Sequence, residues 1–136
     1  MTIKAKRLKL RLTEPTEGEL HASVADYLDW FLMPPAFYTT FPAGWGIMAK
    51  STAGRLKGAG LKPGMPDILV FYERETFGIE LKSFGRKATA IQKVTHMRLL
   101  DAGVKVAVCD SLDMVISALR VWGLPLRRTK GATDAA

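Results

Sequence analysis

The amino-acid sequence predicts an α/β domain in which a mixed central β-sheet is flanked by α-helices. Helical and strand-like hydrophobic patterns alternate along the chain, and no internal repeat interrupts them. The 136 residues suffice for one hydrophobic core but not for two. The composition, 48% hydrophobic and 24% charged, is ordinary for a globular protein. We therefore expect a single domain over residues 1–136.

The first half of the chain predicts one helix and one strand. From Thr16, apolar residues recur at helical spacing until two consecutive prolines, and Thr16 and Glu19 have the spacing of a capping box. The segment FYTTF, residues 37–41, has strand composition. From there to Pro66 the chain is rich in glycine and basic residues with little periodicity, which predicts a long loop.

The second half predicts a hairpin followed by a helix, a strand and a helix. DILVFY and FGIELKS, residues 67–72 and 77–83, are apolar runs separated by the polar ERET, as is typical of a β-hairpin. The later elements are expected as a helix at 88–102, a strand at 104–110 and a helix at 111–122. Both ends, 1–13 and 127–136, are expected to be loose.

Charge and cysteine content narrow the functional classes. The 20 Lys and Arg residues exceed the 13 Asp and Glu residues, and the net charge of +7 should attract polyanions such as nucleic acid. The single cysteine, Cys109, excludes an internal disulfide and a multi-cysteine zinc site, and its apolar surroundings indicate a buried side chain, not a nucleophile. No run resembles a membrane span or a signal peptide, so the expected location is the cytoplasm.

Three charged residues of the predicted hairpin fall on one face of it. With residues 73–76 as the loop, Leu69 lies opposite Glu80 and Asp67 lies opposite Lys82. Asp67, Glu80 and Lys82 then point to the same side, and the apolar residues of both strands point to the other. Asp67 is a diagonal neighbour of Glu80 at roughly 7–8 Å between Cα atoms, close enough for both carboxylates to share one ion.

Such a cluster suits a hard divalent cation. Two carboxylates and a lysine on a mostly buried face are costly unless their charge is compensated. Mg²⁺ takes carboxylate, water and phosphate oxygens, and it can polarise a phosphodiester and activate water. Lys82 could position or deprotonate the attacking water, or stabilise charge on the phosphate. The alternative is structural, with Asp67 and Lys82 in an ion pair and Glu80 solvated.

The stretch KPGMPDILVFYERETFGIELKSFGRKATAIQKVTHMRLLDAGVKVAVCDS resembles the PD-(D/E)XK nuclease superfamily and, within it, the VRR-NUC family. With the first helix included, the resemblance covers about residues 16–122. It implies a restriction-endonuclease-like core and a nuclease that uses Mg²⁺, or Mn²⁺ as a substitute, on structured DNA. Single-domain phage members resemble Holliday-junction resolvases that act as homodimers, which would place the protein in a host cytoplasm.

The resemblance assigns roles residue by residue. Asp67 matches the family's aspartate after proline, and Glu80 and Lys82 match its Glu-x-Lys. Gln92 matches the glutamine on the helix that follows. The carbonyl of Leu81 would be the backbone metal ligand beside Asp67 and Glu80.

The family's first-helix acid falls on Glu17. Glu17 lies on the inward stripe with Leu20 and Val24, whereas Glu19 lies on a different face. Glu17 could hold a water beside the ion or a second ion, or it could simply be a favourable acid in the first helical turn. The family often has glutamine four residues further on, where this chain has His21, and the role of that position stays open.

Gln92 and the basic residues complete the predicted site. Gln92 should point toward the sheet, where Lys82, a water or a backbone group could be its partner. Trp45 could stack on a splayed base or be buried. The basic residues near the motif are candidates for phosphate contacts: Lys50, Arg55, Lys57, Lys62, Arg86, Lys87 and Lys93.

The sequence thus predicts a Mg²⁺-dependent endodeoxyribonuclease that hydrolyses phosphodiester bonds in branched or flapped DNA. Symmetric cutting of two strands needs two sites, so we expect a homodimer. Two alternatives stay open: a catalytically silent nucleic-acid-binding module of the same fold, and a duplex-specific restriction-type endonuclease. Binding alone would not require Asp67, Glu80 and Lys82 to be intact.

Overall fold

A four-stranded mixed sheet forms the centre of the structure, a computed structural model that describes residues 14–41 and 50–129. The elements in chain order are α2 (Glu17–Phe31), β1 (Phe37–Thr40), α3 (Lys50–Gly58), β2 (Ile68–Tyr72), β3 (Glu75–Leu81), α4 (Ala90–Asp101), β4 (Lys105–Cys109) and α5 (Leu112–Val121). The strand order is β1-β2-β3-β4, in which only the β3–β4 pair is parallel. This topology confirms the predicted mixed sheet.

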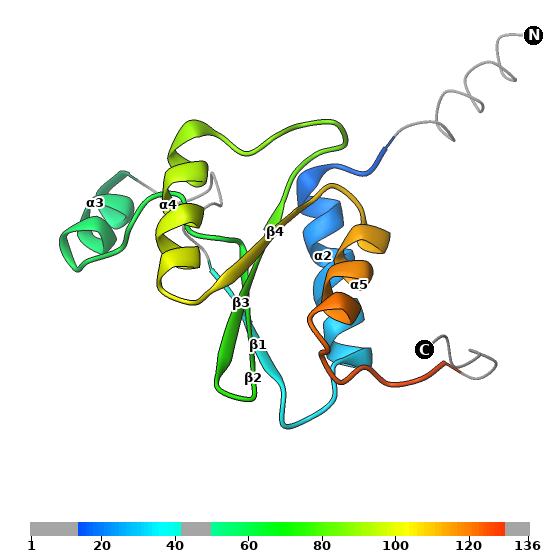
Figure 1. Cartoon of the computed structure of the whole chain (residues 1–136). Helices are drawn as coiled ribbons and strands as arrows, with labels where there is room; N and C mark the ends of the chain where they lie inside the picture. The colour runs from blue at the N-terminus through cyan, green and yellow to red at the C-terminus, as the bar shows by residue number, and fades with distance from the viewer. Residues whose placement is uncertain (1–13, 42–49, 130–136) are drawn as a thin grey trace, which may run out of the picture.

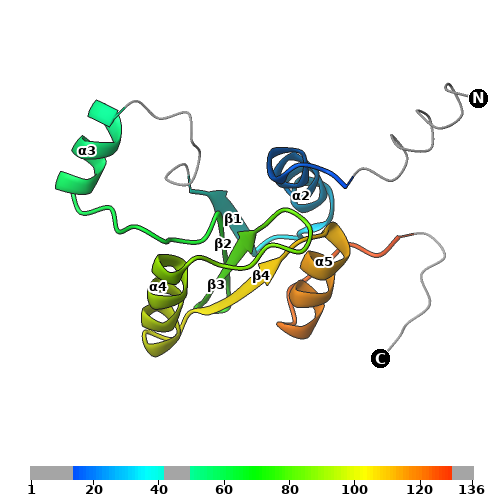
Figure 2. The same ribbon diagram turned by 90° about the horizontal axis from the view of Figure 1, so that it is seen from above.

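The helices form layers on both faces of the sheet. Helices α2 and α5 lie together on one face, and α4 lies on the other (Figure 1). The view from above shows the same division and places α3 at the periphery, on the side of α4 (Figure 2). The sheet is therefore flanked by helices, as the sequence predicts.

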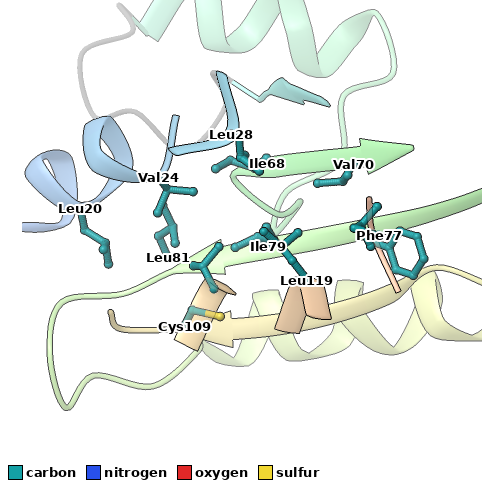
Figure 3. Close-up of a cluster of buried hydrophobic side chains, with 12 residues drawn as sticks. Leu20, Val24, Leu28, Ile68, Val70, Phe77, Ile79, Leu81, Cys109 and Leu119 are labelled. Carbon is teal, nitrogen blue, oxygen red and sulfur yellow. The ribbon is translucent and has the colours of Figure 1, made fainter. Parts of the chain in front are cut away.

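The hydrophobic core of the described residues lies on the side of α2 and α5. Leu20, Val24 and Leu28 are the buried residues of α2 and recur at helical spacing. They pack against the inward residues of β2 and β3 (Figure 3). Helix α4, in contrast, has no buried residue. One face of the sheet thus provides most of the apolar burial, and the other face is left for polar side chains.

The hairpin register differs from the predicted one by two residues. Tyr72 pairs with Glu75, so the turn consists of Glu73 and Arg74 alone, and the expected four-residue loop at 73–76 is wrong. Both turn residues have positive φ, 49° and 66°, as a tight two-residue hairpin turn requires. A shift of two residues preserves the face of every side chain, because side chains in a strand alternate with period two.

A helix occupies part of the stretch between β1 and Pro66 for which a long loop was expected. Helix α3 has the sequence KSTAGRLKG, without an acid in its first turn and with a glycine in its interior. Both features weaken a helical signal, because glycine disfavours helix and an N-terminal acid favours it. Trp45 lies outside the described residues.

Side-chain caps fix the ends of the helices around the sheet. The hydroxyl of Thr16 accepts from the backbone N–H of Glu19, so the predicted start of the first helix is confirmed. After α5 the chain returns to the end of α2, where the N–H of Arg127 donates to the carbonyl of Phe31. Of the ends predicted to be loose, 1–13 and 127–136, only residues 127–129 are described, and this bond holds Arg127 in place, contrary to the prediction. Within the described ranges, each helix is too short or too polar to cross a membrane.

Candidate active site

The central strand pair brings two carboxylates face to face. Ile68 pairs with Ile79, and the same register continued by one residue puts Asp67 directly opposite Glu80. The expected pairing of Asp67 with Lys82 is therefore wrong, and the two acids are direct neighbours, not diagonal ones. The predicted sharing of one face by Asp67, Glu80 and Lys82 is preserved.

This cluster is buried in the sheet face that α4 covers. Asp67, Glu80 and Lys82 are the buried polar side chains of the described residues, with exposed fractions of 8%, 1% and 9%. A solvated Glu80 is thus excluded. Burying three charged groups together is costly and needs compensation within the site.

The segment before Asp67 is packed tightly against β3 and α4. A side chain at Gly78 would approach the ring of Pro66 to 2.7 Å, so only glycine lets this proline lie over β3. Gly64 has a φ of +81°, and an added Cβ would meet the carbonyl oxygen of Ile91 at 2.8 Å. The hydroxyl of Thr95 donates to the carbonyl of Pro63 at 2.7 Å. The Gly-Met-Pro-Asp motif therefore holds Asp67 rigidly at the start of β2.

Asp67 is anchored to the backbone of the neighbouring strand. Its Oδ2 accepts a hydrogen bond from the N–H of Leu81 at 2.7 Å. In a strand the N–H and C=O of one residue point the same way, so the Leu81 carbonyl is also directed toward Asp67. Lys82, the next residue, bonds instead to the Cys109 carbonyl at 2.9 Å. Two carboxylates and one carbonyl thus converge between β2 and β3.

Helix α4 presents one residue to each oxygen of the Glu80 carboxylate. Gln92 Nε2 donates to Oε1 at 2.6 Å, and Lys82 Nζ lies 3.8 Å from the same oxygen. One helical turn later, His96 Nε2 faces Oε2 at 3.7 Å, and both of these buried atoms lack a hydrogen-bond partner. The predicted inward orientation of Gln92 is confirmed. Its amide oxygen also accepts from the N–H of Thr89, which completes the capping box of α4.

The electrostatics of the cluster show a deficit of positive charge. Burial, and then the charge of Asp67, raise the pKa of Glu80 to about 8, although Lys82 acts in the opposite direction. Burial also raises the pKa of Asp67, and the Leu81 N–H offsets part of this rise. Burial and the charge of Lys82 lower the pKa of His96, which favours its neutral form. One lysine does not compensate two buried acids.

A hard divalent cation fits these residues. The buried Oε2 of Glu80 lacks a partner, and Asp67 and the Leu81 carbonyl add oxygen donors of the kind that Mg²⁺ prefers. Among the described residues, no cluster of three or more His, Cys, Asp and Glu side chains is arranged as a metal site. A cation held here would have two carboxylates and a carbonyl as protein ligands, a set that would leave coordination positions for water and substrate as Mg²⁺ usually requires.

A cavity of about 390 Å³ opens onto the two acids. Glu17, exposed in the first turn of α2, lines it together with Asp67, Glu80 and Gln92. Glu19 instead bonds to Thr16. The structure therefore places Glu17, and not Glu19, beside the predicted site. His21 is half-buried one turn further on, and its charge would lower the pKa of Asp67.

The predicted basic residues divide into two groups around the acids. Lys57 and Lys62 line the same cavity as Glu17. A second group lines a separate cavity beside α4: Arg86, Lys87 and Lys93. Arg55 is exposed on α3, and Lys50 is the first residue of that helix. All of those with a described side chain are exposed, as phosphate-contacting residues would have to be.

His96 is the site residue that the sequence analysis missed. It follows Gln92 by four positions on α4, and residues so spaced lie on the same helix face. Once Gln92 was expected to face the sheet, this spacing was sufficient to place His96 beside it. The conflicting signal was the absence of an amphipathic pattern in α4, which buries none of its residues.

Fold and site together define an α/β domain with a buried Asp–Glu–Lys cluster at the end of a central strand pair. No protein-family model matches the sequence. No curated protein matches it either. A solved structure described as a VRR_NUC domain protein is similar to this chain, with a TM-score of 0.61 and 24% sequence identity, covering 79% of this chain and 88% of that one. The fold is therefore that of the VRR_NUC domain protein, as the sequence analysis predicts.

Proposed function

We propose that the protein is a metal-dependent nuclease of the PD-(D/E)XK type that hydrolyses phosphodiester bonds in structured DNA. The observation that supports this proposal most strongly is the burial of Asp67, Glu80 and Lys82 together, with Gln92 bonded to Glu80. A structural ion pair would not need a second acid of raised pKa. The similarity to a VRR_NUC domain protein supports the same class of reaction.

The proposed ion-binding groups are Asp67, Glu80 and the carbonyl of Leu81. When bound, Mg²⁺ polarises a phosphodiester and activates a water. Gln92 limits rotation of the Glu80 carboxylate because it donates a hydrogen bond to one of its oxygens, and His96 faces the other oxygen. The Leu81 N–H fixes one oxygen of Asp67 and leaves the other free.

Lys82 is proposed to position or deprotonate the attacking water, or to stabilise charge on the phosphate. Its ammonium is nearly buried and lies 3.8 Å from Glu80 Oε1, so it can reach the space between the two acids. An ammonium that is largely shielded from water interacts strongly with a phosphate that enters the site. Glu17 is an exposed residue that lines the cavity, where it can contact a water or a second ion.

The proposed substrate is branched or junction DNA, bound by a homodimer. The net charge of +7 and the exposed cations on both sides of the acids favour a polyanion. Symmetric cleavage of a junction requires two sites related by a twofold axis, which a homodimer provides.

The test is cleavage of a labelled four-way junction and a matched linear duplex, in Mg²⁺ and in EDTA. Glu80→Gln should abolish cutting, and Glu75→Gln, an exposed acid on the same strand, should leave it unchanged. Cutting that requires the cation and Glu80 would support the nuclease, and preference for the junction would support structured DNA. Binding without cutting in Mg²⁺ or Mn²⁺ would overturn the proposal in favour of a silent binding module.

A further inference from the structure

A crevice lies where the connections after two parallel strands diverge. β3 and β4 are parallel neighbours, and their carboxyl ends lie side by side. The chain leaves β3 for α4 on one face of the sheet and leaves β4 for α5 on the other (Figure 1). In α/β proteins, ligands bind in the crevice outside the carboxyl ends of strands at such a divergence.

A cavity of about 610 Å³ occupies this crevice. Its volume is within the range of about 300–1,000 Å³ that ligand pockets have. The large apolar side chains among its lining residues are exposed to solvent: Met97 with 68% exposed, Met114 with 45% and Val108 with 36%. They come from α4, α5 and β4 respectively, so the apolar surface is built from three separate elements.

Charged side chains surround this apolar surface. Arg86 and Lys87 follow β3, and Lys93 comes from the first turns of α4. Asp110 is the one acid among the described lining residues, and its Oδ2 accepts from the N–H of Gly85 at 3.3 Å. Three cations and one carboxylate favour an anionic ligand, and the apolar surface favours one that also has a flat hydrophobic part.

The cavity is adjacent to the candidate active site. His96 lines it, and His96 Nε2 lies 3.7 Å from Oε2 of Glu80. A strand whose phosphodiester lay at Glu80 would therefore have its neighbouring nucleotide within reach of the cavity.

We propose that this cavity is a nucleotide subsite that accepts one unpaired nucleotide next to the scissile phosphodiester. The base lies against Met97, Val108 and Met114, and the cations contact its phosphate. The free oxygen of Asp110 accepts from an exocyclic amine of the base. This proposal rests on the proposed nuclease function and supplies a physical reason for a preference for branched DNA, because a paired base cannot enter the cavity.

The test measures binding in EDTA, where the reaction does not run. Methionine methyl signals of the full chain, labelled with ¹³C, are followed while deoxyadenosine monophosphate, inorganic phosphate or deoxyadenosine is added. The nucleotide should shift the Met97 and Met114 signals and leave the Met33 signal unchanged. It should bind more tightly than either of its parts.

Matched variants on α4 separate the subsite from general attraction of anions. Met97→Glu places a negative charge in the cavity and should weaken nucleotide binding by about tenfold or more. Val94 is on the same helix, is 56% exposed and is not among the residues that line the cavity. Val94→Glu should therefore bind the nucleotide nearly as tightly as the wild type does. Both positions are exposed, so both variants should fold.

Several outcomes would overturn the subsite. Equal shifts with phosphate and nucleotide would reduce it to a plain anion site, and unshifted methionine signals would exclude it. Equally weakened nucleotide binding in Met97→Glu and Val94→Glu would also exclude the subsite. None of these outcomes depends on cleavage, so the subsite can fail while the nuclease stands, and nucleotide binding can be measured even if no DNA is cut.

Discussion

At the scale of single residues, Glu80 is a fully buried carboxyl group, and its neighbours would compensate the charge of its ionised form only in part. A carboxylate in such a place destabilises the protein whenever it is ionised without a cation. Residues of this kind are common at functional sites, where stability is reduced to obtain a perturbed pKa. The burial of Glu80 thus supports a functional role and should have a measurable effect on stability.

The stability of the metal-free protein should fall as pH rises. The folded-state pKa of Glu80, about 8, lies above its ordinary value of 4.5, so the folded chain holds a proton that the unfolded chain releases. The resulting destabilisation is absent below the ordinary value and grows as pH rises toward the folded one. Glu80→Gln should therefore unfold at higher urea concentration than the wild type near pH 8 in EDTA, and this advantage should shrink toward about pH 5.

The control is Glu75→Gln, whose exposed carboxylate should give the pH dependence of the wild type. A stability difference between Glu80→Gln and the wild type that does not change with pH would contradict the raised pKa.

Cys109 should be chemically inert in the folded protein. Its side chain is 2% exposed, and burial, with the charge of Asp110, raises the pKa of the thiol to about 11. The thiolate is the reactive form, so both its low population and its burial slow alkylation. Iodoacetamide should modify the urea-unfolded chain rapidly and the native chain only as fast as the β4 region opens, which mass spectrometry over time would measure. Equal rates in the two states would contradict the burial of this thiol.

The residues of the candidate site could be predicted from the sequence to lie together in spite of a wrong register. In the predicted pairing Asp67 was two positions away from its observed place opposite Glu80. A shift by an even number of residues keeps both side chains on the same face of the sheet. His96 was missed because α4 lacks an amphipathic pattern, so that the four-residue spacing from Gln92 was the one signal that could place this half-buried histidine at the site. The proximity of Gln92 and His96 to Glu80 depends on how α4 packs on β3, which the sequence alone does not show.

At the scale of elements, the turn between β2 and β3 is the place where local sequence and structure disagree. Two-residue hairpin turns with positive φ favour Asn-Gly or Asp-Gly, and this turn has Glu73 and Arg74 instead. Neither residue is a turn former, so a longer loop was the natural prediction. The sheet pairing on both sides imposes the tight turn, which is a tertiary effect that the four letters ERET do not encode.

Arg74→Gly should stabilise the protein by about 1 kcal/mol, because a non-glycine residue in the left-handed region costs roughly that much. Its φ of 66° is one that glycine adopts without strain. Urea unfolding measures the change, and DNA cleavage should stay the same because the turn lies at the other end of the hairpin from Asp67. As a control, Arg98→Gly within α4 should destabilise by about 1 kcal/mol. Destabilisation by both substitutions would show that the turn is not strained.

At the scale of the whole molecule, stability and proposed function are divided between the two faces of the sheet. The core lies between the sheet and α2 and α5, and it could be predicted because helical and strand periodicities mark its residues. The acids, the cavities and the cations lie toward α4, which buries none of its side chains. That face lacks a periodic signature, so its cavities and the position of α3 could be obtained only from the folded chain.

This division predicts which cations determine DNA binding. Removal of one lysine that binds a phosphate should reduce the slope of log affinity against log salt by about 0.9 for duplex DNA. Lys57 lines one of the two cavities and Lys93 lines the other. Lys57→Ala and Lys93→Ala should therefore each reduce the slope for junction DNA. The binding is measured by fluorescence anisotropy in EDTA, with Glu80→Gln present in every variant. Lys105, exposed at the amino end of β4, lies at the opposite end of that strand from the acids, and Lys105→Ala should leave the slope unchanged. If all three variants lowered the slope equally, the DNA would be held by the net charge of +7 as a whole and not by the face that contains the acids.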